Sequence, residues 1–89
     1  MTTIKPRLWH TIRQAVSEWV RRRGTVEKLA AEYGYTVRIL NNGQHWEFRR
    51  GVVMLEWWPS TGTTRLNQSF DLSRMHTLDS VRSALKQFA

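Results

Sequence analysis

The chain has 89 residues, of which 40% are hydrophobic, and this size and composition are typical of a single small domain spanning residues 1–89. It contains no cysteine, which excludes disulfides, thiolate catalysis and cysteine-ligated zinc. Fourteen Lys and Arg against seven Asp and Glu give a net charge of +7, and eleven of the fourteen are arginine. Because arginine makes bidentate contacts with phosphates and carboxylates, this balance predicts an anionic partner, either nucleic acid or an acidic protein surface.

Neither a membrane-spanning segment nor a signal peptide is predicted. No apolar run is long enough to cross a bilayer, and the N-terminal "MTTIKPRLWHTIRQ" lacks the charged and then apolar order of a secretory signal. A composition without cysteine also favours an intracellular setting. We therefore expect a cytoplasmic protein without a membrane partner.

Helical periodicity opens the chain. Over residues 8–20 the apolar side chains recur on one stripe, with polar side chains mostly opposite. The stripe consists of Leu8, Trp9, Ile12, Ala15, Val16, Trp19 and Val20, and its two tryptophans are predicted core residues. The basic run with its glycine at 21–24 is expected to end this helix. Thr25 is the predicted N-cap of a second helix over residues 26–33, which Gly34 ends.

From residue 35 the hydrophobic period changes to two. The segments "YTVRIL", "QHWEFR", "VVMLEWW" and "TTRL" are four predicted strands, separated by the turn signals "NNG", "RG" and "PSTG". A two-residue Asn-Gly turn pairs Ile39 with Trp46, and an Arg-Gly turn pairs Trp46 with Leu55. A four-residue PSTG loop then pairs Leu55 with Leu66. All three turns give the same two faces, which predicts an antiparallel meander with one buried face.

The alternation sorts the strand residues into an inner, buried face and an outer face. The inner face carries Val37, Ile39, Trp46, Phe48, Val53, Leu55, Trp57 and Leu66. The outer face carries Thr36, Arg38, Leu40, His45, Glu47, Arg49, Val52, Met54, Glu56, Trp58 and Arg65. A last helix over residues 78–88 is predicted to be capped by Thr77. With helices covering the inner face, the sequence predicts an α+β fold with a four-stranded antiparallel sheet in the order ααββββα.

Two sets of residues are candidate binding sites. Trp58, the second of two adjacent tryptophans, lies on the outer face with Met54 and Arg38, and tryptophan beside arginine is typical of a protein interface. The alternative is that Trp58 packs over the neighbouring turn. The second set is basic, and it is expected to bind nucleic-acid phosphates if the end of the first helix and the tip of the second hairpin lie on the same side. It comprises Arg21, Arg22, Arg23, Arg49, Arg50, Arg13 and Arg82.

The stretch "LAAEYGYTVRIL", residues 29–40, resembles the helix-turn-helix signature of DNA-binding proteins. The matching positions are Leu29, Ala30, the turn glycine Gly34, Tyr35 and Thr36 at the start of the second helix, and Leu40. The resemblance implies a recognition helix in the major groove. Its groove-facing residues would be Thr36, Val37, Arg38 and Asn41. A strand is the alternative, because residues 35–40 alternate with a period of two and an Asn-Gly turn typical of a hairpin follows them.

The central part of the chain resembles another group, small proteins encoded by tailed phages and prophages. The resemblance is carried by "NNGQHWEFRRG", residues 41–51, and "WWPSTG", residues 57–62. These contain a His-Trp-x-aromatic strand and an aromatic-Pro-Ser-Thr-Gly turn. The group has no established activity, so the resemblance implies a phage or mobile-element origin and transfers no catalytic residue.

Catalytic and metal-binding patterns are weak in this sequence. His10, His45 and His76 lie in three different elements, and none has the spacing of a zinc site. The nearest cluster is His45, Glu47 and Glu56 on the outer face, where His45 and Glu56 are expected to be cross-strand neighbours. An open sheet face offers no pocket to tune an acid or a base, so we predict no catalytic residue, no metal and no cofactor.

These observations favour a non-enzymatic binding protein with one of two classes of partner. The first hypothesis is a nucleic-acid-binding protein of phage or prophage type that acts mainly through backbone phosphates. The second is a phage-encoded inhibitor or modulator of a host factor, of the anti-CRISPR or another counter-defence type, that acts by protein contact. The strands at 36–40 and 63–66 are expected at the edges of the sheet, where pairing between subunits would give a homodimer.

Overall fold

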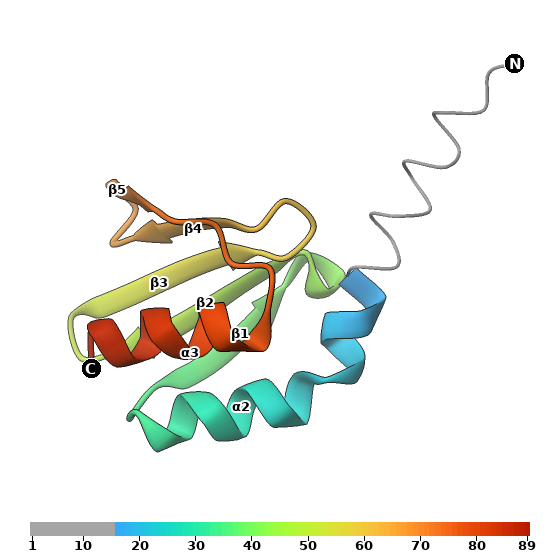
Figure 1. Cartoon of the computed structure of the whole chain (residues 1–89), viewed down its shortest axis with the longest axis horizontal. Coiled ribbons are helices and arrows are strands. Elements are labelled where there is room, and N and C mark those ends of the chain that lie inside the picture. The colour runs from blue at the N-terminus through green and yellow to red at the C-terminus, as the bar shows by residue number, and fades with distance from the viewer. Residues whose placement is uncertain (1–15) are drawn as a thin grey trace, which may run out of the picture.

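The structure, a computed structural model, describes residues 16–89 and consists of a five-stranded antiparallel sheet with the helices packed on one of its faces (Figure 1). In chain order the elements are α2 (Arg23–Glu32), β1 (Thr36–Leu40), the 3-10 turn η1 (Asn41–Gly43), β2 (His45–Arg50), β3 (Val53–Trp58), β4 (Thr63–Leu66), β5 (Phe70–Leu72) and α3 (Leu78–Gln87), and residues 16–21 form a helical segment before α2. The α+β class is thereby confirmed. Over residues 16–89 no helix has the length and apolarity needed to cross a membrane.

The first and third strand pairs have the predicted registers. Ile39 pairs with Trp46 between β1 and β2, and Leu55 pairs with Leu66 between β3 and β4. The first hairpin closes through η1 and one further residue, which makes its loop longer than the predicted two-residue turn. The two asparagines of this loop adopt φ values of 51° and 56°, a left-handed conformation that asparagine tolerates better than most residues.

Between β2 and β3 the predicted register is wrong by two residues. Trp46 pairs with Trp57, not with Leu55. The turn falls one position later than predicted, with Gly51 at its first central position and a φ of 58°, which is the glycine position of a type II′ turn. Because the error is an even number of residues, the strand side chains keep their predicted faces. Val52, predicted on the outer face, instead lies in the turn and is 93% exposed.

The fifth strand, β5, is absent from the sequence-based prediction. It pairs with β4, Leu66 opposite Phe70, and it has only three residues. The turn before it contains neither glycine nor proline, although Asn67 and Gln68 adopt positive φ values of 49° and 62°. The Asn67 side chain accepts a hydrogen bond from the Met54 backbone N–H at 2.8 Å and ties this turn to β3. The edges of the sheet are therefore β1 and β5, and the predicted edge strand at 63–66 is internal.

The start of α2 also differs from the prediction. The helix begins three residues earlier, at Arg23, so Gly24 lies inside it and does not end a helix. Thr25 is not an N-cap, because the N–H of Val26 already donates to the Arg22 carbonyl within a helical turn at 3.1 Å. The predicted end is confirmed, since Gly34 follows the last turn with a φ of 85°.

Three tryptophans form the centre of the core. The Trp19 and Trp57 rings meet edge to face at 4.7 Å, and the Trp46 and Trp57 rings lie 5.4 Å apart. The Trp46 indole N–H donates to the Gly43 carbonyl at 2.8 Å, and the Trp57 indole N–H donates to the Met75 carbonyl at 3.0 Å. The other buried core residues are Val26, Leu29, Ala30, Tyr35, Phe48, Leu55, Met75, Val81 and Leu85. The indole N–H groups of both sheet tryptophans therefore have hydrogen-bond acceptors, which are backbone carbonyls in a turn and in a loop beside the core.

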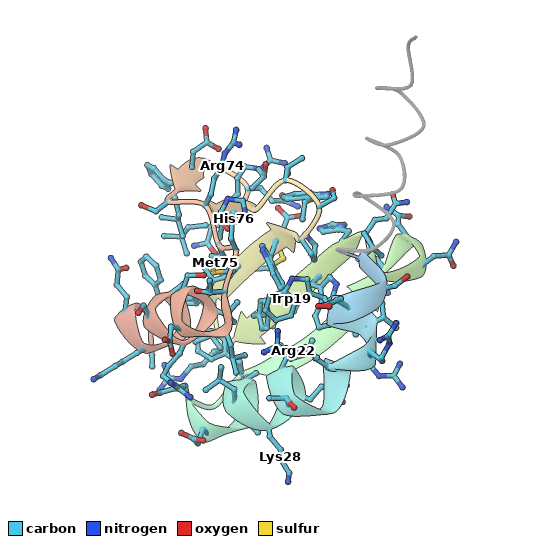
Figure 2. The ribbon with its side chains drawn as sticks, turned by 45° about the vertical axis from the view of Figure 1, so that its right-hand side comes forward. Trp19, Arg22, Lys28, Arg74, Met75 and His76 are labelled. Atoms are coloured by element: carbon cyan, nitrogen blue, oxygen red, sulfur yellow. The ribbon has the colours of Figure 1, made fainter. Side chains whose placement is uncertain are left out.

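Residues 73–77, which include Arg74, Met75 and His76 (Figure 2), join β5 to α3 and are held by hydrogen bonds at Met75 and Thr77. The Met75 N–H donates to the Gly62 carbonyl in the PSTG turn at 2.8 Å. Thr77 caps α3 as predicted. Its side chain accepts from the Ser80 N–H at 3.1 Å, and the Ser80 hydroxyl accepts from the Thr77 N–H at 3.0 Å, which is a reciprocal capping box. The PSTG turn is therefore connected to the segment that leads into α3, and the helix itself begins at its Thr77 cap.

Several sequence predictions fall on residues outside the described part of the chain. These are the helical stripe from 8 to 15 with Trp9, together with His10 and Arg13. Within the described residues Trp19 is buried, which confirms its predicted core position. Residues 36–40 form strand β1, and this does not agree with the recognition helix that the helix-turn-helix resemblance implies.

Candidate functional site

The face of the sheet opposite the helices, the outer face, gathers polar and aromatic side chains from all five strands. Its members are Thr36, Arg38, Leu40, His45, Glu47, Arg49, Met54, Glu56, Trp58, Thr63, Arg65 and Asp71. Five of them are register partners across the whole sheet, in the order Arg38, Glu47, Glu56, Arg65 and Asp71. Because register partners on one face are direct neighbours, these side chains form a single charged row.

Two carboxylates occupy the middle of this row. Glu47 and Glu56 are direct partners across β2 and β3, and they are only 8% and 5% exposed. Glu56 Oε2 lies 3.0 Å from His45 Nε2, and Glu47 Oε1 lies 3.5 Å from Arg49 Nε. The Oε1 atom of each carboxylate is buried without a hydrogen-bond partner. Like charges directly opposite each other in a sheet are destabilising, and buried carboxylates are normally paired, so this arrangement is unusual for a purely structural pair.

An aromatic stack stands beside the carboxylates. The His45 and Trp58 rings are nearly parallel, with 4.4 Å between their centroids and 7° between their planes. The Arg65 guanidinium lies over the Trp58 ring at 5.4 Å. A shallow cavity of about 330 Å³ adjoins the stack and is lined by Trp58, Thr63, Arg65 and Asp71. Trp58 is therefore half-buried by its neighbours and still borders open space.

The structure places the three predicted protein-contact residues on the same face. Met54 and Trp58 flank Glu56 along β3, and Arg38 lies on β1. Met54 and Trp58 are half-buried, and Arg38 is exposed. Trp58 has two properties that are typical of an interface anchor: its ring is stacked on His45, and an arginine, Arg65, lies over it.

The predicted basic set is not gathered into one patch. Val20, directly before the arginine run at 21–23, packs against Gly43 at the β1–β2 turn. Arg50 instead lies beside Gly34, at the opposite end of α2. A ten-residue helix is about 15 Å long, and the two groups of arginines lie at its opposite ends. The helix end and the hairpin tip therefore lie at opposite ends of α2 and do not adjoin.

The remaining members of the basic set are also dispersed. Arg49 projects from the outer face, where Glu47 is its neighbour. Arg82 lies on α3 and pairs with Asp79 at 3.1 Å. Arg22 lies over the Trp19 ring at 4.7 Å but stays exposed (Figure 2). Among the described residues, Arg21 and Arg23 take part in no ion pair.

The excess of positive charge lies outside the outer face. The outer face is balanced, with three arginines against three acidic residues. All other described charges belong to what we call the helix side, which comprises the helices, the 73–77 segment and Arg50. There, eight basic residues (Arg21, Arg22, Arg23, Lys28, Arg50, Arg74, Arg82 and Lys86) stand against four acidic residues (Glu18, Glu27, Glu32 and Asp79). The net positive charge of the described chain therefore lies entirely on the helix side.

Sequence reasoning missed two features of the outer face. Asp71 was not assigned to it, because the three residues of β5 are too few to show a period of two. The direct opposition of Glu47 and Glu56 was missed because it depends on the β2–β3 turn. The glycine at the first central position of that turn is the signal that would have given the correct register.

No protein family, curated protein or solved structure matches this chain, so its function is argued from its own residues.

Proposed function

We propose that this protein is a non-enzymatic binding protein whose helix side binds the phosphate backbone of a nucleic acid. The observation that supports this most directly is the separation of charge between the two faces. Eight basic residues against four acidic ones lie on the helix side, and the outer face is neutral. A surface with one dominant sign of charge attracts a polyanion and orients it toward that side.

Arg21, Arg22 and Arg23 are the centre of the proposed contact. All three are exposed, and they lie where the helical segment 16–21 meets α2. Lys28 points outward from the next turns of α2 (Figure 2). The sequence adds Lys5, Arg7 and Arg13 in the residues before position 16. Contacts of this kind go to phosphates and carry little sequence preference.

Two triple variants with the same change in charge test this proposal. The helix-side variant replaces Arg21, Arg22 and Arg23 with glutamine. The outer-face variant replaces Arg38, Arg49 and Arg65 with glutamine. The two are well matched, because each lowers the net charge by the same amount and each removes one arginine that lies over an indole ring.

The measurement is the affinity for duplex DNA and duplex RNA of arbitrary sequence as a function of salt. The helix-side variant is expected to flatten the dependence of log K on log salt by about two to three units. The reason is that the variant neutralises fewer phosphates, so fewer counterions are released on binding. The outer-face variant is expected to keep a slope near that of the natural chain. Equal flattening in both variants would contradict a directed contact and would leave only a general effect of net charge.

Protein recognition by the outer face is a second candidate function. The specific observation in its favour is that Trp58 is held between His45 and Arg65 on the face that the helices leave open, with Met54 and Arg38 beside it. The partner would be an acidic surface of a host factor that the protein inhibits or modulates. If no nucleic acid binds at about 50 mM salt, while Trp58→Ala abolishes nuclease-resistant capture of a host protein, this second function replaces the first.

A further inference from the structure

We propose that His45, Glu47 and Glu56 form a binding site for a divalent transition-metal ion on the outer face, and that Zn²⁺ is the ion they fit best. One ring nitrogen and one oxygen from each carboxylate lie within 4.8 Å of one another. Imidazole nitrogen and carboxylate oxygen are both donors that zinc takes in proteins, and a zinc site with three protein ligands keeps its fourth position for water. Mg²⁺ and Ca²⁺ prefer sites made only of oxygen ligands.

The burial of the two carboxylates favours the binding of a cation beside them. The Glu56 side chain is only 6% exposed, and its Oε1 atom has no hydrogen-bond partner. Glu47 Oε1 is also buried and makes only the 3.5 Å contact with Arg49. Burying two negative charges next to each other is costly unless a positive group compensates both of them. A divalent ion bound by both carboxylates supplies that compensation with a single group.

The neighbouring arginines do not fill this role. Arg38 is the register partner of Glu47, and Arg65 is the register partner of Glu56, yet neither forms an ion pair with its partner among the described residues. Arg65 instead lies over the Trp58 ring. The Arg49 side chain is 56% exposed and touches only one carboxylate. The buried oxygens therefore remain available to an ion.

The sheet fixes the three ligands in position. His45 and Glu47 are two residues apart on β2 and so share a face, and Glu56 is held opposite Glu47 by the pairing of β2 with β3. The His45 ring is further oriented by its parallel stack on Trp58. Its side chain is 15% exposed and that of Glu47 is 11% exposed, so a small ion can reach the site from the outer face. Ligands on paired strands keep their geometry better than ligands on loops.

Zinc binding to the untagged full chain, first stripped of metal with a chelator, tests the proposal. Isothermal titration with Zn²⁺ is expected to show one site per chain, and Mg²⁺ is expected to show none. Glu56→Gln and His45→Ala should each weaken Zn²⁺ binding by at least about tenfold. His76→Ala is the matched control, because His76 is exposed and lies outside the cluster, and it should bind Zn²⁺ as the natural chain does.

Thermal unfolding shows whether a variant binds less Zn²⁺ because it has lost a metal ligand or because it no longer folds. Glu47→Gln removes one of two opposed buried charges, so the metal-free variant is expected to melt at the same temperature as the natural chain or higher. It should at the same time lose the rise in melting temperature that Zn²⁺ gives the natural chain. An undiminished rise in this variant would contradict the proposal.

A paramagnetic ion locates the site without any substitution. Co²⁺ added in place of Zn²⁺ is expected to broaden the NMR signals of residues 45–47 and 56–58 before all others. Broadening centred on another part of the chain, or the absence of stoichiometric Zn²⁺ binding, would overturn the proposal.

Discussion

Two adjacent tryptophans have different roles because a strand sends neighbouring side chains to opposite faces. Trp57 enters the core, contacts Trp19 and Trp46, and donates to the Met75 carbonyl. Trp58 lies on the outer face, where its ring stacks on the His45 ring and the Arg65 guanidinium lies over it. Two consecutive residues therefore belong to different parts of the molecule, one to the core and the other to the candidate site.

This difference predicts unequal costs of substitution. Trp57→Ala removes a fully buried ring and leaves the Met75 carbonyl without its donor, so it should lower the free energy of unfolding by about 3–5 kcal/mol. Trp58→Ala loses a half-buried ring and its stack, and should cost about 1 kcal/mol. Urea unfolding curves of the two variants give both values. Equal losses would mean that the faces of β3 are assigned incorrectly.

A buried tyrosine gives the stability a specific dependence on pH. The Tyr35 hydroxyl donates to the Leu85 carbonyl at 2.9 Å, and burial raises the pKa of Tyr35 above its usual 10.0 despite the opposing effect of Arg50. The folded state therefore keeps the proton in a range where the unfolded state has lost it. The resulting stabilisation is complete below about pH 10 and disappears as the pH rises through the folded-state pKa.

Comparison with Tyr35→Phe isolates this contribution. The variant should be less stable by about 1 kcal/mol at neutral pH, because the Leu85 carbonyl loses its donor. As the pH rises above 10.0, the usual pKa of tyrosine, the natural chain should lose stability more steeply than the variant. Free energies of unfolding from urea titrations at each pH measure the difference. Parallel pH profiles would show that the Tyr35 proton is not coupled to folding.

At the scale of elements, the PSTG turn is connected to the segment that leads into α3. Gly62 adopts a φ of 79°, and a Cβ there would lie 2.5 Å from Cε1 of His76. Gly62→Ala is therefore expected to lower the free energy of unfolding by about 1–3 kcal/mol, through backbone strain and displacement of the 73–77 segment. Chemical denaturation measures the loss, and amide exchange in the first turn of α3 should become faster.

A second turn glycine provides the control for this prediction. Gly51 has a φ of 58°, and nothing lies within 4 Å of a Cβ built on it, so Gly51→Ala carries the backbone strain alone. Its cost should be smaller than that of Gly62→Ala. Adding His76→Ala to Gly62→Ala should recover part of the stability. A larger loss at Gly51 than at Gly62 would contradict the proposed contact between the turn and the 73–77 segment.

Much of the element arrangement could be predicted because local signals agree with one another. The faces of the strands follow from alternation, and an error of two residues in register leaves them unchanged. The cap at Thr77 follows from its own side-chain chemistry. The start of α2 could not be predicted, since no side-chain hydrogen bond caps it. Strand β5 is likewise too short to carry a pattern.

The candidate site was predictable in its members but not in its geometry. Sequence alternation places His45, Glu47 and Glu56 on one face, and the contact between His45 and Glu56 was expected and is present at 3.0 Å. His45 and Glu56 are nevertheless diagonal neighbours and not register partners, because Glu56 pairs directly with Glu47, two residues after His45 on β2. The burial of both carboxylates could not be read from alternation, which assigns polar residues to solvent.

For the whole molecule, the separation of charge assigns the two proposed binding sites to different faces. The neutral outer face carries the ordered cluster and the aromatic stack, and the helix side carries the excess of positive charge. A polyanion on the helix side would leave the outer face free. The proposed metal site and the proposed nucleic-acid contact therefore do not compete for the same surface.

The order of the strands also bears on how the chain folds. The sheet order β1-β2-β3-β4-β5 is the chain order, so each pairing closes a loop of only a few residues and loses little chain entropy. The hydrogen bond from Tyr35 to Leu85 instead joins positions 50 residues apart. Loop closure therefore favours a pathway in which the hairpins form early and α3 docks late, an order that folding and unfolding rates of variants in each element would resolve.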